Sequence, residues 1–202
     1  MLKGPKRIAK QLNRWWVHRQ IERLGLIECF RGYPAEAIPP KYHQLYGLYR
    51  LARRRKPEVI VELGGGYSTF ALAKACRDLH MAGHHARLYS VDQSAHWQEI
   101  VQMHMPSHLM AYVTFHRADV TGQVPGFASL PVDKANFVFV DGGGLTDSIR
   151  LEERAPKDYA ILVDGRKGTV EYLKRNLRGN YAIKPWMRTQ TLFILQRTRS
   201  PN

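Results

Sequence analysis

The sequence predicts an α/β protein with a doubly wound, Rossmann-like sheet of seven strands. The sheet is expected to be mostly parallel, with an antiparallel C-terminal strand, and to follow N-terminal helices. From residue 58 onward, short apolar runs alternate with segments of helical periodicity, which is the order that builds parallel sheets. The first run, EVIVEL (58–63), has no polar residue before Glu62, as expected of a strand covered on both faces.

The N-terminal part of the chain has a different pattern. Apolar residues at three- or four-residue steps predict an amphipathic helix over 6–26. A connector with three prolines follows at 31–42, and a second helix is expected over 41–55. We therefore divide the chain into a basic helical extension, residues 1–57, and a domain of residues 58–202. The extension is expected to cap the cleft, select the substrate or mediate dimerisation.

The domain is expected to repeat strand, turn and helix. Strands are predicted at 58–63, 86–92, 111–119, 136–141, 159–164, 181–186 and 191–197, with helices at 67–80, 94–105, 145–155 and 168–178. Ligands of such sheets bind outside the carboxyl ends of the parallel strands. Five successive strands end in a carboxylate, namely Glu62, Asp92, Asp119, Asp141 and Asp164. These carboxylates are the first candidates for a binding site.

Charge is distributed unevenly along the 202 residues. Residues 1–56 carry 14 lysines and arginines against 3 acidic residues, and residues 166–202 carry 9 against 1, whereas residues 57–165 have a formal charge of −5. The basic ends favour an anionic partner such as nucleic acid, an acidic membrane surface or an acidic glycan. On the first helix, Trp15 and Trp16 either pack against the domain or belong to a membrane-interface helix.

Cysteine usage and hydropathy limit the cellular context. The two cysteines, Cys29 and Cys76, do not suit a disulfide framework and favour a reducing compartment such as the cytoplasm. The basic opening segment lacks the apolar core of a secretory signal. No stretch approaches the roughly 20 apolar residues of a membrane-spanning helix, so we expect a cytoplasmic protein, peripheral at a membrane at most.

The turn after the first strand, ELGGGYS (62–68), exposes backbone beside a carboxylate. An acidic rim repels phosphate, and the turn lacks the Lys-Ser/Thr of a P-loop, so a nucleoside triphosphate is disfavoured. Carboxylates accept hydrogen bonds from ribose hydroxyls, an exocyclic amine and an ammonium group. The N-terminus of the helix at 67–80 favours a carboxylate. S-adenosylmethionine carries all of these groups.

From about residue 58 to residue 197, the chain resembles the class I S-adenosylmethionine-dependent methyltransferases. Its motifs are nearest to small-molecule O-methyltransferases of the catechol type and related uncharacterised bacterial members. The resemblance rests on ELGGGYS (62–68), SVDQS (90–94), RADV (117–120) and FVFVDGG (137–143), in that order. Ser68 stands where the family pattern often has its last glycine. The implied cofactor contacts are Glu62, Gly64, Gly65, Gly66, Tyr67, Ser68, Asp92, Gln93, Asp119, Val120 and Asp141.

Within these contacts, the resemblance gives Asp92 the ribose, and gives Asp119 and Val120 the adenine. Asp141 borders cofactor and substrate and is the candidate catalytic residue. In the metal-dependent catechol type, an Asp-Asn pair after the fifth strand completes a divalent cation site, but Gly165 follows Asp164 here. Asp141 and Asp164 with waters could still hold Mg²⁺. Without a metal, Asp141 would act as a general base or position the substrate.

These observations predict methyl transfer to an oxygen of a small-molecule or glycan-type acceptor, by a protein that could form a homodimer. A nucleic-acid methyltransferase that uses the basic ends stays open, although no Asn-Pro-Pro-aromatic or catalytic-cysteine signature supports it. A binding protein that keeps the fold without turnover also stays open, because of the departures at Ser68 and Gly165. An NAD(P)-dependent oxidoreductase fits less well, because pyrophosphate would face the acidic rim.

Overall fold

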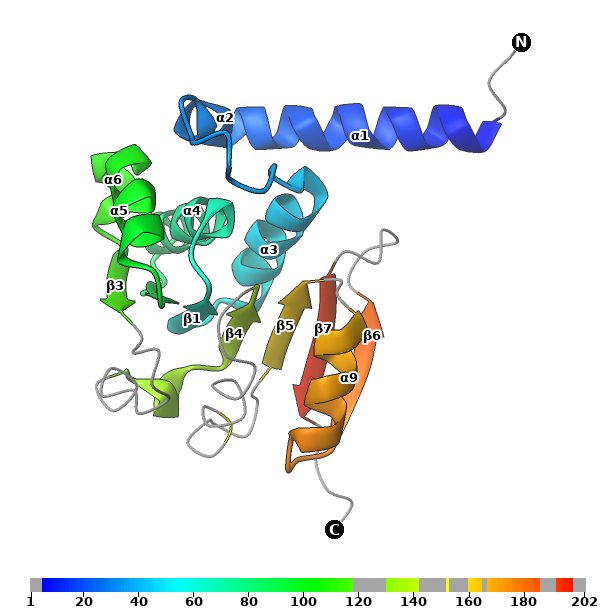
Figure 1. The fold of residues 1–202 in the computed structure, drawn as a ribbon, viewed down its shortest axis with the longest axis vertical. Helices are drawn as coiled ribbons and strands as arrows, with labels where there is room; N and C mark the ends of the chain where they lie inside the picture. Colours follow the sequence, from blue (N-terminus) through cyan, green and yellow to red (C-terminus); the bar gives the residue numbers. More distant parts are fainter. Residues whose placement is uncertain are drawn as a thin grey trace.

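A seven-stranded sheet forms the centre of the protein in a computed structural model (Figure 1). The structure describes residues 5–117, 130–141, 152, 160–164, 167–185 and 192–197. The strands are β1 (Val59–Leu63), β2 (Arg87–Asp92), β3 (Val113–Arg117), β4 (Phe137–Val140), β5 (Ala160–Asp164), β6 (Tyr181–Pro185) and β7 (Leu192–Arg197). Their order is β3-β2-β1-β4-β5-β7-β6. Neighbours from β3 to β5 are parallel, whereas β7 is antiparallel to both β5 and β6. The predicted fold class is confirmed.

Helices cover both faces of the sheet. They are α1 (Pro5–Arg23), α2 (Leu26–Phe30), α3 (Tyr42–Arg55), α4 (Tyr67–Met81), α5 (Ala95–His104), α6 (Ser107–Met110) and α9 (Lys167–Asn176). A short 3₁₀ turn, η1 (Val132–Lys134), leads into β4. The side chains of β1 alternate between two cores: Ile60 belongs to the core with α3 and α4, and Val61 to the core with α9. By the same alternation, Glu62 faces α4.

Two helices differ from the sequence prediction. The helix expected over 6–26 ends at Arg23, and a separate α2 begins at Leu26. Gly25 between them has φ +73, a left-handed conformation that glycine adopts without steric cost and that interrupts the helix. After α5, the backbone is extended at Met105 and Pro106, and one further turn, α6, follows. Of the helix expected over 145–155, only Glu152 lies within the described residues.

The N-terminal extension packs on the domain through α3. Val17 and Ile21 of α1 are fully buried in the helical layer, and α3 packs along α4. The Tyr49 hydroxyl of α3 donates a 2.8 Å hydrogen bond to Asp78 of α4. Cys29 and Cys76 are buried free thiols. Within the described residues, no helix has the length and apolar character needed to cross a membrane.

Candidate active site

The turn between β1 and α4 is held through hydrogen bonds that its backbone N–H groups donate to β2 and α4. Gly64 has φ +93, which favours glycine, and its N–H donates to the Val91 carbonyl at 2.9 Å. The N–H of Gly65 donates to Asp92 Oδ2 at 2.8 Å, and that of Gly66 to Thr69 Oγ1 at 3.0 Å. The turn is therefore tied to the carboxyl end of β2 and to the first turn of α4.

Glu62 lies beneath this turn, completely buried. It is opposite Ser90 in the parallel register of β1 and β2. Its Oε2 accepts hydrogen bonds from Thr69 Oγ1 at 2.7 Å and from Ser90 Oγ at 2.8 Å. Because Thr69 also accepts from Gly66, Glu62 orders the turn through its neighbours. In the described part of the chain, its second oxygen, Oε1, is buried without a hydrogen-bond partner.

Burial raises the pKa of Glu62 from 4.5 to about 7, against the opposing effect of the hydroxyls of Ser68, Thr69 and Ser90. Between pH 4.5 and about pH 7, Glu62 therefore holds a proton in the folded protein that it has released in the unfolded chain. Its stabilising contribution is fully present below about pH 4.5 and is lost as the pH rises through about 7.

We therefore predict that Glu62→Gln changes the stability of the protein in a pH-dependent way. Between about pH 5 and about pH 8, the free energy of unfolding of the variant should rise relative to the wild type by up to about 3 kcal/mol. Urea denaturation at both pH values measures this difference. The matched control is Glu99→Gln, because Glu99 is exposed on α5. A constant difference between Glu62→Gln and wild type across this range contradicts the prediction.

Asp92 connects the turn to α5. Its Oδ2 accepts from Gly65, and its Oδ1 accepts from the Ser94 N–H at 2.8 Å. Ser94 caps α5 by accepting a hydrogen bond from the Trp97 N–H at 3.2 Å. Each Asp92 oxygen can accept a further hydrogen bond from a ligand hydroxyl. This chain of contacts also fixes Trp97 in the first turn of α5.

A cavity of about 400 Å³ opens at the carboxyl ends of β1, β2 and β4. This is the edge where the strand order reverses between β1 and β4. The predicted residues that line it are Gly64, Gly65, Gly66, Tyr67, Ser68, Asp92 and Asp141. Asp141 reaches this position because its N–H donates to the Leu63 carbonyl at 3.0 Å and extends the pairing of β4 with β1. The structure therefore brings seven of the predicted residues to one cavity.

The other predicted residues do not line it. Glu62 lies beneath the turn, and Gln93 is half-buried outside the lining of the cavity. Asp119 and Val120 lie outside the described residues, as does the side chain of Asp164. Among the side chains that the structure describes, no group of three His, Cys, Asp or Glu residues could hold a metal ion. The Asp141–Asp164 metal pair stays a prediction.

The sequence analysis missed the opposite wall of the cavity. This wall consists of Tyr33, Glu36, Ala37, Ile38, Pro39, Pro40 and Lys41 from the connector, Gln44 and Leu45 from α3, and Trp97 from α5. The cluster of prolines marks this segment as a connector, and its aromatic residue is the one local signal of a binding role. The ring centroids of Tyr33 and Tyr67 lie 4.4 Å apart, and this contact attaches the connector to the first turn of α4.

Two polar groups in this wall lack partners. The hydroxyl of Tyr33 and Nε2 of Gln44 are buried without a hydrogen bond among the described residues. Burial raises the pKa of Tyr33, so the phenol remains a protonated donor. Because unpaired buried donors are costly, a ligand oxygen in the cavity would relieve them.

The comparisons with known proteins give a family match and a set of structures with the same fold. Residues 61–158 match the model of a family described as a methyltransferase domain. A Podospora anserina methyltransferase bound to S-adenosylhomocysteine (SAH) has 14% identity and a TM-score of 0.68, covering 98% of this chain and 99% of its own. A Geobacter sulfurreducens methyltransferase has 18% identity and a TM-score of 0.61, covering 96% and 99%. No curated protein sequence matches significantly.

A Bacillus cereus O-methyltransferase in complex with SAH has 16% identity to this chain and a TM-score of 0.60. The match covers 88% of this chain and 90% of that one. At such identities, these structures establish the fold, while the family match covers the segment that carries the end of β1, the glycine turn and Asp141. Residues 61–158 thus match a methyltransferase-domain family, and the chain as a whole shares the fold of these methyltransferase structures.

Proposed function

We propose that this protein transfers a methyl group from S-adenosylmethionine to an oxygen of a small-molecule or glycan-type acceptor. The observation that carries the proposal is the cavity, in which Gly64–Gly66, Asp92 and Asp141 face a wall from the N-terminal connector. The O-methyltransferase among the similar structures supports oxygen as the acceptor atom. The resemblance of FVFVDGG (137–143) to the fourth-strand motif of catechol-type O-methyltransferases also supports an oxygen acceptor.

The donor set fits the cofactor. Asp92 offers acceptor capacity for ribose hydroxyls, and the turn exposes backbone at the N-terminus of α4. Trp97 offers an aromatic surface beside Asp92 for a flat base, an addition to the predicted Asp119 and Val120. Glu62 lies beneath the turn and outside the lining of the cavity, so it would support the cofactor by ordering the backbone of the turn. The cofactor supplies an electrophilic methyl group on a sulfonium.

The protein's own contribution would be alignment and exclusion of water. In our proposal, Asp141 accepts the proton of the acceptor hydroxyl or orients that hydroxyl toward the methyl group. Its place at the end of β4, in the wall of the cavity that faces the connector, supports this role. A Mg²⁺ ion held by Asp141 and Asp164 would act by lowering the pKa of the hydroxyl. Comparing turnover in EDTA and in Mg²⁺ distinguishes the two routes.

A binding panel tests the cofactor assignment. Thermal shift with SAH, NADH and ATP should show stabilisation by SAH alone, since a ligand that binds only the folded state raises the melting temperature. Stabilisation by NADH without SAH would instead support an oxidoreductase. SAH binding without turnover on catechols, phenols and hydroxylated sugars would favour a binding protein that keeps the fold.

We also propose that residues 1–57 select the acceptor, because the connector and the start of α3 form the wall opposite the glycine turn. Tyr33→Phe and Gln44→Leu each remove one unpartnered donor while keeping the shape of the side chain. We predict that each lowers kcat/KM for the acceptor by about 5- to 30-fold, the value of one hydrogen bond to an oxygen. The Kd for SAH should change less than about twofold.

Steady-state kinetics on the best acceptor of the panel give kcat/KM, and calorimetry gives the Kd for SAH. The matched control is Tyr46→Phe, because Tyr46 lies on α3 outside the lining of the cavity. An equal loss of acceptor and SAH affinity in Tyr33→Phe would place the phenol on the cofactor instead. If kcat/KM is unchanged in both Tyr33→Phe and Gln44→Leu, the wall opposite the glycine turn does not select the acceptor.

The basic ends are proposed to contact an anionic partner, and a nucleic acid would make the protein a nucleic-acid methyltransferase. The triplet Arg53–Arg55 closes α3, where its charge also stabilises the helix end. Binding to a generic RNA that weakens steeply with salt, together with methyl transfer to it, would support that alternative. Homodimer formation is checked by light scattering on a sizing column.

A further inference from the structure

The outer side of α1 exposes large apolar side chains. Leu12 and Trp15 are each 61% exposed, and Trp16 is 40% exposed. These three make up half of the six large exposed hydrophobic residues in the described part of the chain. Spacings of three and four residues place them on one side of the helix. Burial of indole and leucine surface is a large favourable term, so exposing them on one helix is costly.

The opposite side of α1 already has its partners. Val17 and Ile21, half a turn away from Leu12 and Trp15, are fully buried. The ring centroids of His18 and Tyr42 lie 5.2 Å apart, edge to face. Trp16 lies at the border between the two sides: its ring meets Tyr46 edge-on, with centroids 5.3 Å apart, and the residue is still 40% exposed. Packing against α3 therefore accounts for the inner side of α1, and it leaves Leu12 and Trp15 uncovered within the described residues.

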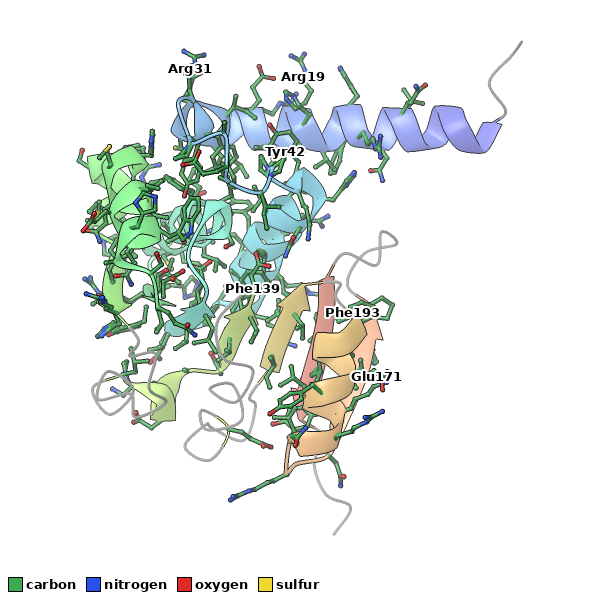
Figure 2. The ribbon with its side chains drawn as sticks, in the orientation of Figure 1. Arg19, Arg31, Tyr42, Phe139, Glu171 and Phe193 are labelled. Carbon is green, nitrogen blue, oxygen red and sulfur yellow. The ribbon has the colours of Figure 1, made fainter. Side chains whose placement is uncertain are left out.

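Basic side chains border the exposed apolar surface. Arg19 lies over the Trp15 ring at 5.5 Å, with an exposed surface ion pair to Glu22 at 3.6 Å. Arg23 is exposed one turn further along. Figure 2 shows Arg19 pointing away from the side of α1 that faces Tyr42. Over its whole length, the helix carries six basic residues and one acidic residue.

We propose that the outer face of α1, formed by Leu12, Trp15, Trp16, Arg19 and Arg23, docks onto a bilayer that carries anionic headgroups. Tryptophan and leucine suit the boundary between headgroups and acyl chains, and guanidinium groups suit lipid phosphates. Each basic residue near an anionic surface adds to the attraction. The helix projects beyond the sheet at its N-terminal end (Figure 1), and Leu12 and Trp15 are exposed on it.

Charge favours this occupant over a second copy of the chain. Two extensions with a formal charge of +11 each would repel one another if they met through this face. A nucleic acid would match the positive charge of the face, but it has no apolar surface that would cover Leu12. A membrane surface uses both the apolar and the basic side chains of the face.

Vesicle flotation of the full chain tests the proposal. At about 0.15 M salt, we expect binding to phosphatidylcholine vesicles with about 30% phosphatidylglycerol and at least tenfold weaker partitioning to pure phosphatidylcholine. Leu12→Ser with Trp15→Ser should lower partitioning about tenfold, and Arg19→Gln with Arg23→Gln should lower it about fivefold. The matched control is Met81→Ser with Met103→Ser, because these residues are exposed elsewhere. It should stay within twofold of the wild type.

The melting temperature of each variant with and without SAH establishes that it is folded before its partitioning is compared. Equal partitioning of the wild type to both kinds of vesicle overturns the proposal, and so does its absence from both. Loss of a dimer in the Leu12/Trp15 variant without lipid would assign the face to a second copy. RNA binding that the same variant abolishes, without vesicle binding, would assign it to nucleic acid. These results do not depend on methyl transfer.

Discussion

Replacing Asp92 with alanine is expected to weaken the binding of SAH by about 10- to 100-fold. A hydrogen bond to a charged group contributes about 1.5–3 kcal/mol, and Asp92 makes its contacts on two sides. It accepts the N–H groups of Gly65 and Ser94, and it faces the cavity where we place the ribose. Its loss therefore removes a ligand contact and loosens both the glycine turn and the cap of α5. Isothermal titration with SAH measures the change.

Two further substitutions separate these effects. Asp92→Asn keeps one carbonyl oxygen, so its affinity should fall between those of the wild type and the alanine variant. Glu99→Ala removes a negative charge from an exposed position on α5, and it should leave the affinity unchanged. If the Kd for SAH in Asp92→Ala stays within about threefold of the wild-type value, the cofactor does not use this carboxylate. The position proposed for the ribose would then be wrong.

Replacing Asp141 with alanine should lower kcat by about 100-fold or more, the contribution typical of a positioned general base. Asp141 stands at the end of β4 in the wall of the cavity, where its backbone is fixed by the Leu63 carbonyl. Because the substitution leaves the turn and Asp92 in place, the Kd for SAH should change less than about fivefold. Release of SAH from an accepted catechol, phenol or hydroxylated sugar measures kcat.

The pattern of the loss identifies the role of Asp141. If Asp141 is a general base without a metal, the kcat of Asp141→Asn should be nearly as low as that of Asp141→Ala. If Asp141 only positions the acceptor, Asp141→Asn should keep most of the wild-type kcat. The matched control is Asp133→Asn, an exposed carboxylate in the turn before β4. A kcat within about threefold of wild type in both Asp141 variants would exclude a catalytic role.

The local features of this protein were readable in its sequence. Strand and helix periodicities are properties of neighbouring residues, and each described strand lies within two residues of its predicted limits. The glycine turn was readable for the same reason, because Gly64 needs a left-handed backbone and Gly65 approaches Asp92. The carboxyl ends of parallel strands meet at one edge, so Asp92 and Asp141 could be placed together before their contacts were known.

The role of Glu62 depended on packing. The sequence places it at the end of a strand with the other acids, but the register sets it opposite Ser90, and the alternation of β1 turns it toward Thr69. Its carboxylate is therefore buried beneath the turn and does not line the cavity. Whether a strand-end carboxylate reaches the ligand or supports the backbone depends on which side of the sheet it faces.

The sequence by itself determined the doubly wound domain, the acidic strand ends and the cofactor chemistry that they suit, because these follow from local periodicity and turn chemistry. Only the tertiary structure decided which segment closes the cavity. The connector from Tyr33 to Lys41 has no periodic pattern, and its position follows from aromatic packing on Tyr67 and from the docking of α3 on α4. Such contacts join residues far apart in the chain, so no local pattern encodes them.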